Sequence, residues 1–468
     1  MRKTCVFWCA LLLTSVVACV DHAPQPHPTA WREGGFLGDV SQSIATDNEG
    51  NVYITGTYNG QVTFGSVTLP TTGGGDIFIV KYNRMGVVQW ARSAGTFRPE
   101  SGLDIAVDSQ GNVYVTGFFN GSINFGHIWL TAPVAQTGSV FFGEAFVAKY
   151  NTNGEVQWAH RAGGTGVDLG ESIALDRDGN VFVTGSFQET ASFGSATLTA
   201  TNGSDMFIVK YNTNGEVLWV KKVDGSSHAS GKGIATDGSG YVYVTGEFKS
   251  AVSLDGESLG SGGDSDVLLA KLNNDGALQW IRSAGGVEGD FSSGIAADES
   301  GNVSITGIFR SNATFAGVTL TNNGVYDIFV AHYSTSGTLQ WARGLGGRQY
   351  DLAGDITTGK DGSVYVVGSF RESVTVGNQT FKTKETGNAT GNISTDLILI
   401  KFDKDGTPLW AKQEGGDGFD SNEFVLGITY SSMNELYITG HFYGTPILSG
   451  TTLISAGQND IFVAKYSE

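Results

Sequence analysis

The chain has 468 residues, of which 40% are hydrophobic and 16% are charged, and its formal net charge at pH 7 is −18. This composition is typical of a globular protein and excludes a disordered one. The acidic excess argues against nucleic acids and anionic membrane surfaces as partners, because both require a basic footprint on the protein.

The beginning of the chain has the pattern of a secreted bacterial protein. Residues 1–18 are predicted to be a signal peptide, because a basic start (MRK) precedes an apolar run too short to cross a bilayer as a helix. The letters VVAC at positions 16–19 resemble a bacterial lipobox, which implies cleavage before Cys19 and acylation of that cysteine. Ordinary signal-peptidase cleavage at the same point is the alternative. Residues 19–28, with three prolines, would then form a lipidated tether.

From residue 29 onward one unit recurs about every 60 residues. In the third unit, residues 173–175 are a short apolar run that ends at an Asp-x-Asp-Gly turn. Three further strands are predicted at 180–187, 206–211 and 216–220, the last two joined by an Asn-Gly hairpin turn. A tryptophan marks the fourth strand of each unit: Trp31, Trp90, Trp158, Trp219, Trp280, Trp341 and Trp410.

Four short antiparallel strands per unit, without a sustained helical period, predict an all-β protein whose units are propeller blades. The last unit stops at Glu468 before any fourth strand, whereas residues 29–35 are a fourth strand with no unit before them. We therefore predict that this N-terminal strand completes the blade at 424–466. The predicted domain is a seven-bladed β-propeller at 29–468, a closed ring without free strand edges. The three cysteines lie at or before position 19, so the ring holds no disulfide.

Two columns of residues in the second strands support this interpretation. A glycine recurs there, which predicts a bulge or a close backbone approach: Gly56, Gly117, Gly185, Gly246, Gly307, Gly368 and Gly440. A large aromatic residue follows two positions later and is predicted to wedge between neighbouring blades: Tyr58, Phe119, Phe187, Phe248, Phe309, Phe370 and Phe442.

The pattern DxxGNVYVTG…FG…L…D.FVAKYN.NGEVQWA resembles the bacterial beta-propeller repeat family often called SBBP repeats. The resemblance extends from residue 29 to the end of the chain and departs only in the sixth and seventh units, which lack the turn aspartate. It implies a surface or secreted propeller. The letters NxNGEVQW also resemble the tryptophan-docking motif of quinone-dependent alcohol dehydrogenases, which is a structural clasp and implies no cofactor.

The candidate site residues are an acidic column that precedes each first strand. If this column rings one mouth of the central channel, it forms a cation or amine site. Calcium is the cofactor that such a site would bind. The alternative is that each acid braces a loop by accepting backbone N–H bonds. The column consists of Asp39, Glu100, Asp168, Asp290 and Asp351, with Asp420 or Glu423 in the seventh unit and Ala229 in the fourth. The metal candidates among them are Asp39, Asp168, Asp290 and Asp351.

Two other polar columns have structural interpretations. In the Asp-x-x-Gly turns at Asp47, Asp108, Asp176, Asp237 and Asp298, the aspartate is expected to bond its own downstream backbone without a metal. A column of third-strand lysines, each five residues after an acid, is predicted to form surface ion pairs or solvated edge charges. The lysines are Lys81, Lys149, Lys210, Lys271, Lys401 and Lys465, with His332 in the fifth unit.

Repetition with few unusual polar residues favours a non-enzymatic binding or scaffolding propeller. We expect it to be monomeric and lipid-anchored at the bacterial outer membrane or cell surface, with a protein or glycan ligand and no nucleic acid. Its ligand face would consist of the insertions at 130–143 and 382–395. One alternative is an enzyme that uses channel-mouth carboxylates on extracellular polysaccharide. A second is a calcium-stabilised structural surface protein.

Overall fold

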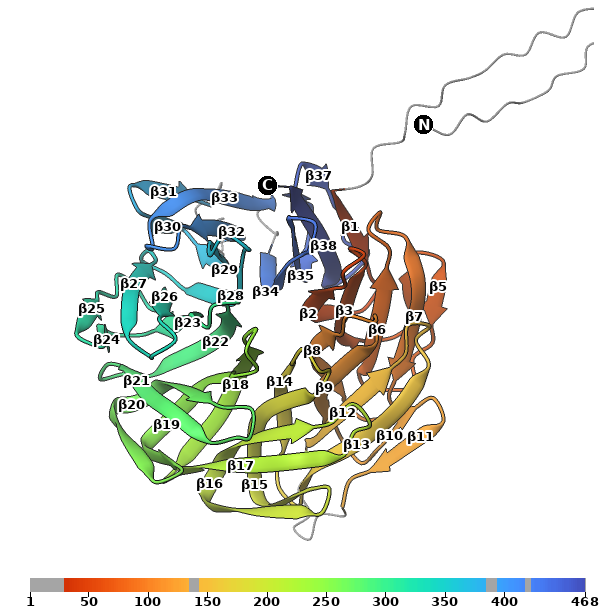
Figure 1. Ribbon diagram of the computed structural model, residues 1–468. Coiled ribbons are helices and arrows are strands. Elements are labelled where there is room, and N and C mark those ends of the chain that lie inside the picture. Colours follow the sequence, from red (N-terminus) through yellow and green to blue (C-terminus); the bar gives the residue numbers. More distant parts are fainter. Residues whose placement is uncertain (1–28, 134–142, 384–393, 417–421, 468) are drawn as a thin grey trace, which may run out of the picture.

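The computed structural model describes residues 29–133, 143–383, 394–416 and 422–467 (Figure 1). Within these ranges the regular structure consists of β-strands, from β1 (Ala30–Glu33) to β38 (Asp460–Ser467), as the all-β prediction requires. In the same ranges no helix is long and apolar enough to cross a membrane. The predicted signal peptide, Cys19 and the tether lie outside the described residues.

The third unit shows the order of strands. It consists of β14 (Leu169–Leu175), β15 (Val181–Phe193), β16 (Ala196–Tyr211) and β17 (Val217–Gly225). Each strand pairs antiparallel with the next one along the chain. The predicted second and third strands are longer than the sequence pattern indicated, because an outer hairpin extends β15 and β16 past their apolar cores. The fourth strand is longer because the end of β17 pairs with β19 (Val242–Leu254) of the next unit.

The other units repeat this order. Their first strands are β2 (Val40–Thr46), β8 (Ser101–Val107), β18 (His228–Thr236), β22 (Asp290–Ala297), β28 (Asp351–Thr358) and β34 (Asn422–Tyr430). Their second strands are β3 (Val52–Tyr58), β9 (Val113–Phe119), β19 (Val242–Leu254), β23 (Val303–Phe309), β29 (Val364–Arg371) and β35 (Glu435–Tyr443).

The third strands are β6 (Asp76–Tyr82), β12 (Glu144–Tyr150), β20 (Glu257–Leu272), β26 (Asp327–Tyr333), β32 (Thr395–Phe402) and β38. The fourth strands are β7 (Val88–Ala94), β13 (Val156–Gly164), β21 (Leu278–Gly285), β27 (Leu339–Leu345), β33 (Pro408–Gly416) and β1. Small outer hairpins are formed by β4 (Val62–Phe64) with β5 (Val67–Leu69), β10 (Ser122–Phe125) with β11 (Ile128–Thr131), β24 (Ala313–Phe315) with β25 (Val318–Leu320), β30 (Ser373–Val376) with β31 (Gln379–Lys382), and β36 (Pro446–Leu448) with β37 (Thr451–Thr452).

The first strands lie nearest the centre of the molecule (Figure 1). Each contacts the first strand of the next unit, and β2 contacts β34 as well as β8. The N-terminal strand β1 pairs antiparallel with β38, with Trp31 opposite Val463. The two ends of the propeller therefore share one sheet, as the sequence predicts.

The second-strand glycines have a clear steric reason. A Cβ on Gly117 would stand 1.9 Å from the carbonyl oxygen of Ser101, which no backbone could tolerate without shifting. The register of β8 against β9 also shifts between Gly102 and Asp104, which marks a bulge in the first strand. At the other six glycines of the column, an added Cβ would stand 1.8–2.7 Å from the equivalent carbonyl oxygen. Both the bulge and the close backbone approach are therefore confirmed.

The hydrophobic core lies between units rather than within each unit. Phe119, which is fully buried, packs in one cluster with its own neighbour Phe146 and with Tyr53 and Ile77 of the preceding unit. The whole aromatic column is equally buried, as wedges between units should be. A single unit could not bury these faces alone.

The tryptophans clasp the next unit around the ring. The indole Nε1 of Trp90 donates to the carbonyl oxygen of Thr152 at 3.0 Å. Its ring lies against Gly154, where φ is +73° and a Cβ would stand 2.7 Å from Cδ2 of the indole. Four further tryptophans donate to the corresponding carbonyl: Trp158, Trp219, Trp280 and Trp341. Trp31 lies on Gly86 in the same way.

Candidate functional site

A hollow of about 1030 Å³ opens at the end of the ring where the first strands finish. Its wall consists of the last residues of β8, β14, β18, β22, β28 and β34 and of the turns that follow them. These are the Asp-x-x-Gly turns of the second to fifth units and their counterparts in the sixth and seventh units. The sequence had placed the candidate site at the other end of the first strands.

The turn aspartates hold this wall in shape. Oδ1 of Asp176 accepts the backbone N–H groups of Asp178 (3.0 Å) and Asn180 (2.9 Å), and its Oδ2 accepts the Asn180 amide at 2.7 Å. Gly179 completes the turn at φ +79°, where a side chain would be strained. Equivalent backbone bonds occur at Asp47, Asp108, Asp237 and Asp298. These are the contacts expected if each turn aspartate bonds its own downstream backbone without a metal ion.

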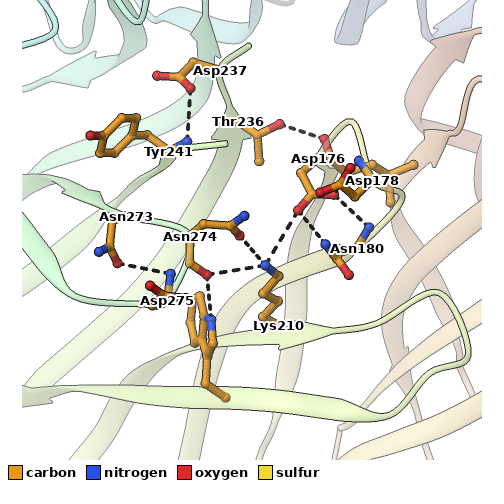
Figure 2. Close-up of polar contacts among 12 residues, drawn as sticks. Asp176, Asp178, Asn180, Lys210, Thr236, Asp237, Tyr241, Asn273, Asn274 and Asp275 are labelled. Carbon is orange, nitrogen blue, oxygen red and sulfur yellow. Dashed lines mark hydrogen bonds and ion pairs between the residues drawn. The ribbon is translucent and has the colours of Figure 1, made fainter. Parts of the chain in front are cut away.

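The prediction of surface ion pairs or solvated edge charges is wrong for two of the third-strand lysines, Lys210 and Lys271. Lys210 is buried, and its amine contacts Asp176 Oδ2 at 3.6 Å and the carbonyl oxygen of Asn274 in the next unit at 3.3 Å (Figure 2). The amine also lies 5.0 Å from the centre of the Phe182 ring. Third strands lie between second and fourth strands, so their lysines are not at a sheet edge. Lys271 is buried in the same way, above Tyr243.

The acids that lie five residues before these lysines do not form surface ion pairs with them either. Asp205, five residues before Lys210, is buried at the opposite end of the strand. Its oxygens accept the backbone N–H groups of Thr201 and Gly225 at 3.2 and 2.8 Å. A spacing of five puts two residues on opposite faces of a strand, about 16 Å apart along it, so direct pairing was not available.

The rim of the hollow carries charged side chains that take no part in forming the turns. Arg177 and Glu299, from the third and fifth units, form an ion pair although their side chains are 69% and 79% exposed. Lys360 donates to the carbonyl oxygen of Ser432 in the next unit at 2.6 Å. These residues occupy the two middle positions of their turns, which carry different residues in each unit: Asn48 and Glu49, Ser109 and Gln110, Arg177 and Asp178, Gly238 and Ser239, Glu299 and Ser300, Lys360 and Asp361, Ser432 and Met433.

The acidic column does not form an open ring of carboxylates. Asp168 is fully buried, and its two oxygens accept the backbone N–H groups of Gly164 (2.6 Å) and Gln188 (3.2 Å). Asp39 accepts those of Gly35 (2.7 Å) and Asn59 (3.0 Å). The channel-mouth prediction fails because the carboxylates turn into their own loops, which is the loop-bracing alternative.

The remaining members of the column behave alike. Glu100, Asp290 and Asp351 are buried and accept from Thr96, Gly286 and Gly347 respectively. Glu423 is buried too, and Asp420 lies outside the described residues. The structure places Asp39, Asp168, Asp290 and Asp351 in separate junctions between units. Among the described residues, no group of three or more His, Cys, Asp or Glu side chains is placed to hold a metal ion.

Burial changes the protonation of these acids. It raises the pKa of Asp39 to about 6, of Asp168 and Asp290 to about 7, and of Asp351 to about 8, and the backbone N–H bonds oppose this only in part. A raised pKa suits a general acid, but these carboxyls are inaccessible to a polymer substrate.

Sequence reasoning missed two aspartates inside the channel. Asp104 accepts the hydroxyls of Ser43 (2.6 Å) and Ser172 (2.8 Å), and so links the first three units. Asp355 stands in the sixth unit and accepts the backbone N–H of Ile428 at 3.2 Å. Burial, with a smaller contribution from the Asp104 charge, raises the pKa of Asp355 to about 7. One sequence pattern could have identified Asp104 and Asp355: the other units have a small residue at this position. These residues are Ser43, Ser172, Gly233, Gly294 and Gly427.

Comparison with known proteins agrees with this architecture. Residues 157–186 match the SBBP beta-propeller repeat, which supports a repeat of the SBBP type in this chain. It is 23% identical to an uncharacterized WD repeat-containing protein of Acanthamoeba polyphaga mimivirus, over 93% of this chain and 38% of that protein. It is 26% identical to the regulatory protein FlaEY of Caulobacter vibrioides, over 78% of this chain and 40% of that protein.

The chain thus spans about two fifths of the length of each of these curated relatives. Among solved structures, the WD40 domain of Pan2 from Neurospora crassa is similar over 93% of this chain and 98% of that domain, with a TM-score of 0.43 and 11% identity.

Proposed function

We propose that this β-propeller repeat protein is a non-enzymatic binding or scaffolding module with seven blades, and that its ligand occupies the hollow at the Asp-x-x-Gly end. The observation that carries the proposal is that the residues of each turn have two separate roles. The aspartate and glycine repeat because they build the turn, whereas the two middle residues differ in charge and size from one unit to the next. A varied rim on a repeated scaffold is what selective recognition requires.

The closed ring is supported by two contacts. First strands touch in cyclic order, including β34 with β2, and β1 completes the sheet of β38. A closed ring holds the rim residues of distant units at fixed separations. A ligand that contacts several turns then binds a pre-formed surface, and this reduces the ordering cost of binding.

The chemistry of the rim indicates a polar or charged ligand. Arg177, Lys360 and Lys404 offer positive groups, while Asp178 and Glu299 offer negative ones. Most of the surface that lines the hollow is polar, so a protein loop or a glycan with matching groups fits better than an apolar molecule. The turn aspartates use their oxygens within the turns, so we favour binding over hydrolysis of the ligand.

The proposal also includes attachment to the outside of a bacterial membrane through a lipidated Cys19, with the propeller acting as a monomer. The lipobox-like letters at 16–19 support this part. The sequence predicts a different ligand face, formed by the insertions at 130–143 and 382–395. Their residues 134–142 and 384–393 lie outside the described residues.

The binding site is tested by charge reversal. Arg177→Glu with Lys360→Glu should weaken binding to hits from glycan and peptide arrays by at least tenfold, because both changes invert the rim. Lys249→Glu, an exposed lysine that pairs with Asp264 on an outer strand, is the matched control and should leave binding unchanged. Equal affinity of the double variant and the wild type for every array hit would contradict the hollow as the site.

A further inference from the structure

Carboxyl groups face one another at several junctions between neighbouring units. At the junction of the fourth and fifth units, Asp266 at the third strand β20 faces Asp290 at the first strand β22. The point where a Cβ of Gly285 would stand is 2.4 Å from Asp266 Oδ1 and 2.8 Å from Asp290 Oδ2. At the next junction, Asp327 Oδ1 lies 2.2 Å from the same point on Gly346, and Asp351 Oδ2 accepts the N–H of the adjacent Gly347 at 2.7 Å. All four side chains are buried.

The hydrogen bonds leave two oxygens of each pair, one on each carboxyl group, without a donor. Gly262 N–H donates to Asp266 Oδ2 at 2.7 Å, and Gly286 N–H donates to Asp290 Oδ2 at 2.6 Å. The Oδ1 atoms of Asp266 and Asp290 are buried and accept no hydrogen bond, and those of Asp327 and Asp351 are in the same position. Two ionised carboxylates in this arrangement would combine burial, repulsion and an unsatisfied oxygen.

Three other junctions supply a positive side chain instead. Arg161 contacts Glu144 at 3.1 Å, and Arg32 contacts Asp460 at 3.2 Å. Between the third and fourth units, Ala229 replaces the facing acid, and Asp205 contacts Lys222 at 3.5 Å. At this junction Asp205 Oδ1 accepts the N–H of Gly225. Where a facing acid is present, the equivalent N–H donates to that acid instead, as Gly286 does to Asp290.

Among the described residues, no ion pair with a cation is found at Asp266, Asp290, Asp327 or Asp351. Arg310, beside Asp290, points its guanidinium at the Tyr326 ring, 4.8 Å from its centre. Arg371, beside Asp351, donates from Nε to Thr395 Oγ1 at 3.1 Å. The further charge near Asp290 is Glu288, which is negative. Some other positive charge must therefore neutralise each pair.

We propose that each of these two junctions holds one proton at neutral pH, shared between its facing carboxyl groups, and that the ring is therefore stabilised by protonation. The hydroxyl formed at Asp266 Oδ1 donates to Asp290 Oδ2, and Asp327 donates to Asp351 in the same way. Paired carboxyls of this kind titrate as a unit. This inference concerns the junctions and is independent of what the hollow binds.

The sign of the pH dependence follows from the folded-state protonation. Burial first, and the facing charge next, raise the pKa of Asp290 to about 7 and of Asp351 to about 8, whereas an unfolded aspartate titrates near 4. Between those pH values the folded chain holds more protons than the unfolded chain, so its stability falls as the pH rises. The stabilisation is complete below about pH 4 and is lost through pH 7 to 8.

The test uses the full mature domain and replaces the proton by an amide. In Asp266→Asn with Asp327→Asn, each new amide N–H can donate to the facing aspartate without a titrating proton. The wild-type melting temperature should fall by several degrees between pH 6 and pH 9. The double variant should show a smaller fall, because Asp168 and Asp355 still titrate in this range, and should melt higher than the wild type at pH 9. Asp205→Asn, at the junction with Lys222, is the control and should bring no gain.

Two further measurements keep the proposal falsifiable if the variants fold poorly. Infrared spectra of the wild type at pH 7 should show protonated carboxyl absorption that disappears by pH 9, and its absence at pH 7 would overturn the shared proton. Calcium titration at pH 9 supplies the competing result. A calcium-dependent rise in the melting temperature that the double variant lacks would show that the pairs take a metal ion and not a proton.

Discussion

At the scale of single residues, this propeller depends on positions where a side chain is missing. Gly117 lets the bulged carbonyl of Ser101 approach within a distance at which a Cβ would collide. Gly154 lets the Trp90 ring lie on the backbone of the next unit. Polar residues act at the same scale: Lys210 and Trp219 donate to the same carbonyl oxygen of Asn274. Each of these contacts joins neighbouring strands or neighbouring units.

Gly117→Ala should destabilise the protein by about 2–4 kcal/mol, because the added methyl must displace backbone. Thermal or urea unfolding measures this. Gly260→Ala is the matched control, since a Cβ there meets nothing closer than 3.9 Å. Equal stability of the two variants would show that the close approach at Gly117 is relaxed in solution.

At the scale of the elements, β1 is the contact between the two ends of the folded chain. It pairs with β38 over four residues, and Trp31 packs against Tyr82 of the first unit with ring centres 5.5 Å apart. The strand therefore contributes both to the sheet of the last unit and to the packing of the first. Without it, β38 would present an unpaired edge.

Trp31→Ala should lower the free energy of unfolding by about 2–4 kcal/mol, since a half-buried indole is removed. Deleting residues 29–36 should produce an aggregating protein, which light scattering would detect. Trp129→Ala, at a side chain that is 62% exposed on β11, is the control and should be neutral. A deletion that stays monomeric with unchanged melting would mean that β1 does not close the ring.

At the scale of the whole molecule, the chain combines a ring with a terminal segment whose role is membrane attachment in our proposal. One acyl chain binds membranes only marginally, whereas two or more hold a protein stably. Repetition also shapes the ring as a whole, because each unit buries its apolar face against the next. The acidic net charge keeps such a particle away from anionic surfaces that it is not tethered to.

Cys19→Ser should abolish lipid attachment and move correctly processed protein from the membrane fraction to the soluble fraction. Cell fractionation and mass spectrometry of the mature N-terminus in a bacterial host measure both effects. Cys9→Ser, within the predicted signal peptide, is the control and should leave lipidation intact. An unmodified Cys19 in the wild-type protein would refute the anchor.

The amino-acid sequence by itself determined the strands, the repeat and the pairing of β1 with the last unit. These depend on local alternation, turn residues and a period of about 60, which a linear pattern displays directly. It also identified the glycine and aromatic columns, since a position with one steric requirement repeats in each copy.

Only the tertiary structure decided where the polar columns point. Asp168 and Asp39 turn into loops, Lys210 lies beneath the next unit, and Asp104 bridges three units across the channel. Sequence spacing shows which residues share a strand, but not which loop N–H or which neighbouring unit a side chain meets. The physical reason is that partners such as those of Lys210 and Asp104 lie 61 to 69 residues away and are brought close only when the units pack around the ring. The partners of Asp168 and Asp39 include loop N–H groups four residues away, and the fold of those loops decides these contacts.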